Sequence, residues 1–293
     1  MLQFAGKISV AEIMGDLFGE KIRIFSSLPI FLVSAGFVAV QIKVISWTME
    51  YFTEIEQFQC LILSSIVVIA YSAFGGVKAV TFTDVLQFFI FSIAIIFILI
   101  FMSLKIDSNT ESNQIFLDHL FKFEESKRGY YFVLFIYLLI PSLSPPSVQR
   151  LLMARNTSQM KSSYKLSAII LLAFFVLFNL LGCLIYLSNP NLESNQIMPY
   201  IFDNFTYPGL KGLFLIGILA LAMSTADSHL NAGAVSFSHD FCMPLGIFKN
   251  FSELAISRIF SVLSGIAAIF LATKFQDLIC LILFIHNFYA PVI

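Results

Sequence analysis

The sequence predicts an all-α integral membrane protein with about eight transmembrane helices. Of its 293 residues, 58% are hydrophobic and 12% are charged, whereas roughly 25% of the residues of a soluble domain are charged. The mean hydropathy is +0.88. The apolar residues form long windows, and a helix needs about 20 of them to cross a bilayer. Stretches such as FFIFSIAIIFILIFMSL do not alternate as β-barrel strands do.

The apolar windows predict one helix each, and turn or charged residues separate them. Gly75 and Gly76 are expected to end the second span, with Lys78 in a turn before the third. Three prolines, at 141, 145 and 146, are expected to interrupt the fourth. The predicted spans lie near residues 25–46, 58–76, 83–104, 129–147, 165–188, 208–230, 257–273 and 277–293.

The distribution of charge predicts the orientation of these helices. The segment VQRLLMARNTSQMKSSYK carries four basic residues and no acid, which is typical of a cytoplasmic loop. The segment TMEYFTEIEQ carries three acids and no base, and is expected outside. The N-terminus and the loops at 77–82, 149–164 and 241–256 are therefore expected in the cytoplasm. We expect a multi-pass protein of the plasma membrane, with the bacterial inner membrane as the leading location.

Composition argues against several other classes of protein. A formal net charge of −1 and a pI near 6.4 do not indicate a nucleic-acid partner. The four cysteines lie in or beside apolar runs without metal-type spacing, so neither a zinc site nor a disulfide framework is expected. Trp47, the single tryptophan, is expected to be an interfacial anchor or packing residue.

A polar face within an apolar window is the main candidate for a functional site. Ser224, Asp227, Ser228 and Asn231 follow the i, i+3, i+4, i+7 spacing of one helix face. An ionised carboxylate in a membrane helix costs at least a few kcal/mol, so such groups usually face a bundle interior or an aqueous cavity. The structural alternative is that the hydroxyls bond to backbone carbonyls or to a neighbouring helix.

These side chains offer oxygen ligands and a formal negative charge, which suit a hard monovalent cation. The carbonyl of Leu221 would lie one turn before the hydroxyls of Ser224 and Thr225, so the three could form half of a cage. Sodium fits this chemistry better than zinc or copper, which prefer imidazole or thiolate ligands.

A second intramembrane acid, Asp84, lies in AFGGVKAVTFTDVLQFFIF and shares a helix face with Thr83 and Gln87. It is interpreted in two ways. It could be part of a functional site, or it could be an acid favoured by the dipole near a helix N-terminus.

Three motifs carry a resemblance to a known family. GGVKAVTFTDVLQ looks like the signature of the sodium:solute symporter family, AMSTADS looks like its sodium-site helix, and PPSVQRLLMARN is similar to its loop of a proline followed by a basic residue. The resemblance implies the leucine-transporter architecture of two inverted five-helix repeats, with solute and ions between broken helices. It also implies sodium-driven uptake of a small organic solute, such as proline, by alternating access.

Carried onto this sequence, the resemblance implies a principal sodium site at the carbonyl of Leu221 and the hydroxyls of Ser224 and Thr225. It implies a possible second sodium at Asp84, Asp227 and Ser228. The whole chain, residues 1–293, is expected to be a single partial domain of this family. It is expected to begin after two core helices of the first repeat and to end within the tenth.

The partners expected are the solute, the lipid bilayer and, in one interpretation, a separately encoded segment that supplies the missing helices. An enzyme is not expected, although an intramembrane aspartyl protease using Asp84 and Asp227 would also place two acids in the membrane. Such a dyad would need two carboxylates sharing a proton. A symporter-like sensory membrane module and a non-functional remnant of a transporter are two further interpretations of the same motifs.

Overall fold

A computed structural model describes residues 4 and 6–105, then 129, 132, 144–193, 196–248, 250–275 and 277–289. This part of the chain contains helices and no strand. It divides into two compact units, and α3, α7 and α9 each contribute residues to both. The first unit comprises Met1–Phe91, Ser144–Tyr164 and Leu215–Ile293, and the second comprises Ser92–Leu143 and Lys165–Phe214.

Six helical stretches in the described residues are long and apolar enough to cross a membrane. They are Glu20–Thr53, Gln57–Gly75, Val80–Lys105, Thr157–Ser188, Pro208–Cys242 and Glu253–Lys274. The chain is thus an all-α, multi-pass membrane protein. Of the two other predicted spans, 129–147 lies almost wholly outside the described residues. The last, 277–293, is described only as far as α11 (Leu278–Tyr289), a helix of 12 residues.

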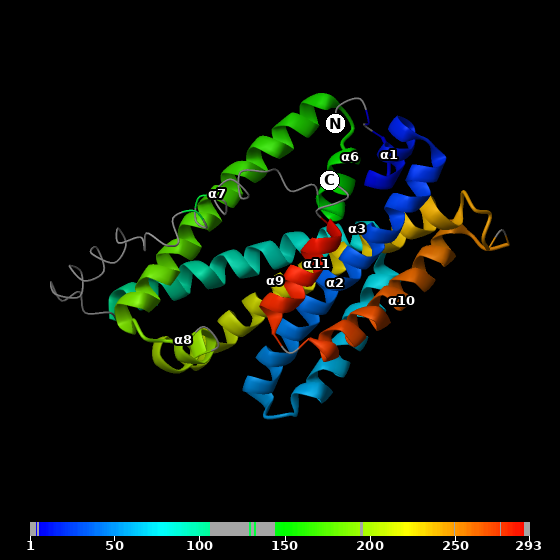
Figure 1. The fold of residues 1–293 in the computed structure, drawn as a ribbon. Coiled ribbons are helices and arrows are strands. Elements are labelled where there is room, and N and C mark those ends of the chain that lie inside the picture. Colours follow the sequence, from blue (N-terminus) through cyan, green and yellow to red (C-terminus); the bar gives the residue numbers. More distant parts are fainter. Residues whose placement is uncertain are drawn as a thin grey trace. The chain divides into compact units, whose positions relative to one another are not determined.

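The spans predicted on either side of residues 77–82 are confirmed as the candidate spans Gln57–Gly75 and Val80–Lys105, and both belong to one helix, α3 (Gln57–Lys105). The two predicted spans are its two halves, and Figure 1 shows the helix changing direction between them. A glycine pair such as Gly75–Gly76 permits a sharp bend while the helix continues.

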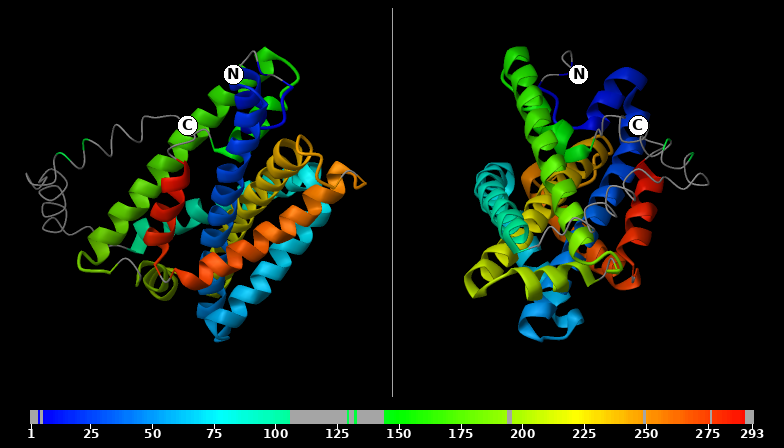
Figure 2. Two further views of the ribbon diagram at one scale, coloured as in Figure 1. Left: turned by 45° about the vertical axis from the view of Figure 1, so that its right-hand side comes forward. Right: turned by 90° about the vertical axis from the view of Figure 1, so that its left-hand side faces the viewer.

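The centre of the first unit is α2 (Glu20–Thr53), which has the largest buried share of the six candidate spans. It packs against α1 (Val10–Phe18), α10 (Glu253–Lys274) and α11, and Figures 1 and 2 show α10 and α11 running beside it. The core that these helices share with α3 and α9 (Pro208–Ser236) is aliphatic. Its members include Val33, Val38, Ile42, Leu61, Val68, Ala226, Leu230, Ala268, Leu281 and Ile285.

Small residues allow α9 to approach α2 closely. A Cβ atom added at Gly233 would lie 2.6 Å from the Cβ of Ser34. Ala226 and Ala234 of the same helix are completely buried. Close approach through glycine and alanine is the usual way in which membrane helices gain packing contacts. This contact packs the small-residue face of α9 against α2.

Short elements lie at the helix ends of the first unit that the sequence predicts to be cytoplasmic. α9 continues into a π-helical turn, η4 (Phe237–Cys242). α6 (Pro145–Leu152) begins with two prolines in its first turn, where the missing N–H groups cost nothing. The amide of Gly6 donates to the carbonyl of Leu152, 3.2 Å away, so the N-terminal segment is tied to α6.

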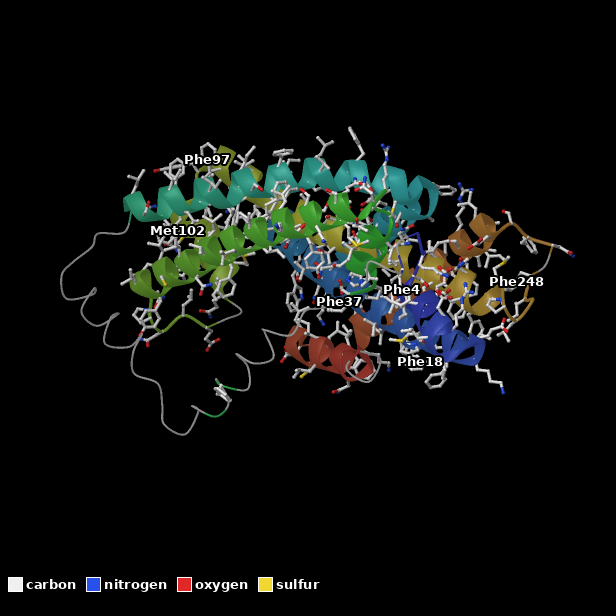
Figure 3. The ribbon with its side chains drawn as sticks, turned by 90° about the horizontal axis from the view of Figure 1, so that it is seen from above. Phe4, Phe18, Phe37, Phe97, Met102 and Phe248 are labelled. Carbon is white, nitrogen blue, oxygen red and sulfur yellow. The ribbon has the colours of Figure 1, made fainter. Side chains whose placement is uncertain are left out.

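The second unit contains the end of α3, most of α7 (Thr157–Ser188), α8 (Ile197–Phe205) and the first turns of α9. Aromatic contacts stabilise it, since the rings of Phe202 and Phe214 are 5.1 Å apart. Apolar side chains project outward from its helices, as Figure 3 shows for Phe97, which is 45% exposed. α7 is almost entirely exposed along its apolar length. Such a surface suits contact with lipid.

Candidate functional site

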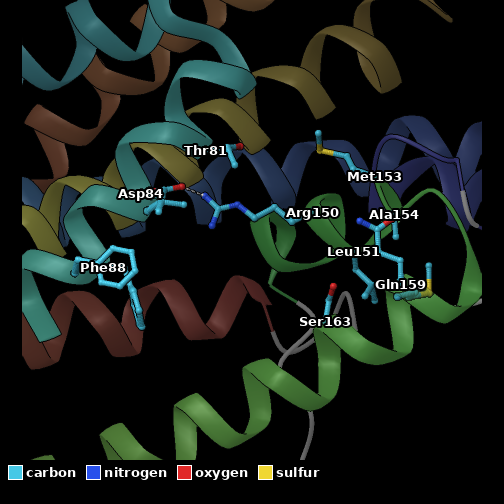
Figure 4. Close-up of a pocket in the computed structure, with 12 residues that line it drawn as sticks. Thr81, Asp84, Phe88, Arg150, Leu151, Met153, Ala154, Gln159 and Ser163 are labelled. Carbon is cyan, nitrogen blue, oxygen red and sulfur yellow. Dashed lines mark hydrogen bonds and ion pairs between the residues drawn. The ribbon is translucent and has the colours of Figure 1, made fainter.

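The candidate site lies in the first unit, where α3, α6 and α9 meet. Asp84 of α3 accepts hydrogen bonds from the hydroxyl of Ser224 on α9 and from the guanidinium of Arg150 on α6. Its side chain is only 12% exposed. Figure 4 shows Arg150 extending toward Asp84. Asp84 therefore directly contacts the face of α9 that carries the hydroxyl groups, so the two polar features of the sequence lie side by side.

Arg150 links the two long helices through a single nitrogen. Its Nη2 atom donates to Asp84 and also to the hydroxyl of Ser228, 2.5 Å away. Ser228 in turn donates to the backbone carbonyl of Ser224 at 2.7 Å. We call Asp84, Arg150, Ser224 and Ser228 the Asp84 cluster. In this cluster the positive charge is the guanidinium of Arg150, which is bound to the carboxylate of Asp84 and the hydroxyl of Ser228.

The atoms expected to form the first sodium site are neighbours on one turn of α9. The hydroxyl of Thr225 donates to the carbonyl of Leu221 at a distance of 3.1 Å. A hydroxyl that donates its hydrogen keeps its lone pairs available to a cation. Ser224 is shared, since its hydroxyl is the donor to Asp84. Two of the three oxygens are therefore in contact with each other, and the third belongs to the Asp84 cluster.

Asp227 is placed differently from the other site candidates. It is completely buried, and neither of its carboxylate oxygens has a hydrogen-bond partner among the described residues. The structure does not bring it into contact with Asp84, with which the sequence had grouped it. A buried carboxylate without compensation is costly. Asp227 therefore needs either a proton or a cation.

Further along the same face, Asn231 lies near Gln149, with 3.5 Å between the amide nitrogen and oxygen. Gln149 is buried and belongs to α6. All of the predicted face except Asp227 therefore has a polar contact in the structure, either to α6, to α3 or within α9. The spacing argument correctly grouped these residues, and α6 is the element that covers them.

A cavity of about 520 Å³ lies beside the Asp84 cluster. Its walls come from α3, α6 and the first turns of α7, all within the first unit, and Figure 4 shows the lining side chains. Phe88 and Phe89 supply apolar walls, whereas Asp84, Arg150 and Gln159 supply polar groups. The charge distribution of the sequence predicts that this end of the bundle faces the cytoplasm.

Arg150 is the site residue that the sequence analysis missed. The sequence showed it only as one of four basic residues that mark a cytoplasmic loop. The signal that could have revealed it was its place in PPSVQRLLMARN, one helical turn after two prolines. A short helix that begins at Pro145 directs that residue toward Asp84.

The long apolar helices and the oxygen-rich face of α9 define a multi-pass membrane protein of the transporter class. The family model described as the sodium:solute symporter family matches residues 1–293. The chain belongs to that family, as its three sequence motifs predicted.

Two curated relatives show what this chain is similar to. It is 26% identical over 291 residues to the sodium/sialic acid symporter NanT of Aliivibrio fischeri (strain ATCC 700601 / ES114), which covers 90% of this chain and 57% of the relative. It is 26% identical over 262 residues to a putative sodium-dependent multivitamin transporter of Drosophila melanogaster, covering 81% and 43% respectively. The chain therefore spans about half the length of these relatives. Their names do not support proline, the solute suggested by the sequence.

A solved structure has the same fold. It is that of a sodium-coupled sialic acid symporter in a substrate-bound, outward-open state that reveals a novel sodium site. The TM-score is 0.76 at 22% sequence identity, over 91% of this chain and 61% of that one. The likeness supports the expected transporter fold.

Proposed function

We propose that this chain is the ion-binding part of a sodium-coupled symporter that moves a small organic solute by alternating access. The observation that carries the proposal is the contact between Asp84 of α3 and Ser224 of α9, which are 140 residues apart in sequence. It joins a carboxylate to a helix face that offers hydroxyl and carbonyl oxygens. Oxygen donors with one nearby negative charge suit sodium.

The principal sodium site in this proposal uses the carbonyl of Leu221 and the hydroxyls of Ser224 and Thr225. Their support is the one-turn geometry of α9, in which Thr225 already contacts the Leu221 carbonyl. Further oxygens must come from elsewhere, since three ligands from one turn can surround only one side of an ion.

The second sodium site in this proposal uses Asp84, Asp227 and Ser228. Arg150 contacts two of these three residues. The guanidinium of Arg150 donates to Asp84 and Ser228, so it competes with sodium for those two oxygens. Asp227 contributes a buried carboxylate without a partner in the described chain. A sodium ion near it would offset the cost of burying that charge.

Sodium can drive transport only if it favours one conformation over another. Each sodium that moves down a potential of 100 mV releases about 2.3 kcal/mol, in addition to the concentration term. In the proposed cycle, sodium bound at α9 favours the solute-binding state. The displaced Arg150 side chain returns to Asp84 when sodium leaves toward the cytoplasm.

The solute is proposed to be a small organic acid. The support is the name of the curated relative, a sodium/sialic acid symporter, and sialic acid is therefore the first solute to assay. The separately encoded segment expected from the sequence also remains a prediction, which co-purification of the tagged chain from its own cells would test.

The experiment that tests the sodium proposal is binding of radioactive sodium to the purified chain. Thr225→Ala removes one proposed ligand, and Thr225→Ser restores the hydroxyl. Thr48→Ala is a matched control, because Thr48 also donates to the carbonyl four residues earlier, at 2.8 Å, but lies on α2. We expect weaker sodium binding in Thr225→Ala alone. Equal binding by Thr225→Ala and the unchanged chain would remove the principal site from the proposal.

A further inference from the structure

A buried lysine lies far from the Asp84 cluster in sequence and contacts none of its members. Lys43 of α2 is 4% exposed and is the only basic residue among the buried charged residues of the described chain, histidine aside. Its neighbours Ile42 and Ile45 are apolar and buried. An ammonium group in such a setting must be compensated by polar partners or by negative charge.

Backbone carbonyls provide part of that compensation. The ammonium of Lys43 donates to the carbonyl of Phe275 and lies 3.4 Å from that of Ala272. These carbonyls belong to the last turn of α10 and its cap, where helices leave acceptors unpaired and carry partial negative charge. Lys43 therefore stabilises the end of α10, but these carbonyls are neutral groups and cannot balance a full charge.

The same ammonium borders a cavity of about 450 Å³. This volume lies in the usual range for sites that bind small molecules. The walls combine the Lys43 charge with the amide of Gln57, the hydroxyl of Thr273 and the rings of Trp47 and Phe58. No acidic residue of the described chain lines it. The exposed carboxylate of Asp277 acts on Lys43 electrostatically, but it is not part of the wall.

The charge distribution along the sequence places this cavity on the outer side. Lys43 lies in the second half of α2, Gln57 is the first residue of α3, and Thr273 lies in the last turn of α10. These helix ends are opposite to the cytoplasmic loops. A solute entering from outside would therefore reach the cavity without passing the Asp84 cluster.

We propose that the Lys43 cavity is an outer binding site for a carboxylate-bearing solute. Lys43 binds the carboxylate, because a charge-assisted hydrogen bond is about twice as strong as a neutral one. Gln57 and Thr273 bind the polar substituents, and Phe58 and Trp47 contact the apolar part of the solute. The proposal rests on the proposed function, since the cavity would collect an organic acid on its way to the transport site.

The chain offers a specific reporter for this cavity. Trp47 is its single tryptophan, it lines the cavity, and the Lys43 ammonium lies 5.5 Å from the centre of its ring. A ligand that binds Lys43 changes the charge beside the indole and therefore its fluorescence. The test is a fluorescence titration of the purified chain with sialic acid in buffer without sodium. The methyl ester of sialic acid is the matched neutral probe.

We expect a saturable change with sialic acid and none with its ester. Lys43→Gln should weaken binding at least tenfold, whereas Lys43→Arg should stay within threefold. Lys274→Gln removes a charge near the same helix end, outside the lining, and should leave binding unchanged. Gln57→Leu leaves Lys43 and its carbonyl contacts in place, so it tests the cavity even if Lys43→Gln does not fold. We expect it to weaken binding about three- to tenfold.

Three results would overturn the site: no saturable response of the unchanged chain, equal responses to the acid and its ester, or unaltered affinity in both Lys43→Gln and Gln57→Leu. Because the titration contains no sodium, its outcome is independent of the α9 cation sites. Loss of sodium binding in Thr225→Ala with no response at Trp47 would retain the proposed function and reject the outer site. The reverse pattern would reject the sodium sites alone.

Discussion

Arg23 of α2 and Asp240 of η4 form an ion pair with 2.9 Å between Nε and Oδ1, although 217 residues separate them. Asp240 is completely buried. Its second oxygen accepts from Ser9 at 2.5 Å and from Ser236 at 2.9 Å. The N-terminal segment, the start of α2 and the end of α9 are thus held by one carboxylate.

This arrangement predicts that Arg23→Gln destabilises the chain more than Asp240→Asn does. Removing the arginine leaves a buried charge without its cation, at a cost of about 3 kcal/mol, whereas removing the charge itself avoids that penalty. Thermal unfolding in detergent measures which of the two variants is less stable. Lys21→Gln, on the same turn of α2, is the control. If Arg23→Gln unfolds at the temperature of Lys21→Gln, the ion pair has no stabilising role.

The Asp84 cluster predicts that Arg150→Gln binds sodium more tightly. The guanidinium and the ion need the same oxygens of Asp84 and Ser228, so removing the guanidinium removes a competitor. We expect a several-fold lower sodium concentration for half-maximal binding, and no gain in Arg150→Lys. Arg155→Gln, a substitution in the same segment outside the cluster, serves as the control. Weaker sodium binding in Arg150→Gln would show that the arginine supports the ion site and does not compete for it.

The burial of Asp227 predicts that Asp227→Asn reduces the stabilisation of the chain by sodium. A ligand present at 100 times its dissociation constant stabilises a protein by about 2.7 kcal/mol. We expect the unchanged chain to unfold at a higher temperature in sodium than in choline, and Asp227→Asn to lose part of that difference. A sodium effect of the same size in both proteins would separate Asp227 from the cation sites.

The close approach of α9 and α2 predicts a steric effect at Gly233. A side chain there would meet the Cβ of Ser34, so Gly233→Val should destabilise the first unit by about 1–3 kcal/mol. Gly182 of α7 provides the comparison, since nothing lies within 4 Å of a Cβ atom added there. Gly182→Val should unfold near the temperature of the unchanged chain. Equal loss at both positions would indicate a backbone effect and no special contact at Gly233.

Local patterns predicted much of the fold and part of the site. The spacing of Ser224, Asp227, Ser228 and Asn231 predicted a common helix face, because a helix repeats every 3.6 residues. Three of these residues contact α3 or α6, whereas Asp227 has no hydrogen-bond partner among the described residues. The two spans predicted on either side of residues 77–82 are present, as Gln57–Gly75 and Val80–Lys105, although both belong to the single helix α3. Asp84 was left between two interpretations, and its contacts with Ser224 and Arg150 depend on packing between helices that no local pattern contains.

The sequence by itself determined that this chain crosses a membrane as α-helices, and its motifs placed it in a symporter family. Burying backbone in lipid requires internal hydrogen bonds, so hydropathy and length suffice for that conclusion. Only the tertiary structure decided that Arg150 reaches Asp84 and Ser228, and that Lys43 borders a cavity. These pairings join residues 66 and 78 positions apart in the first case. Contacts at such separations depend on how helices pack, which no local pattern contains.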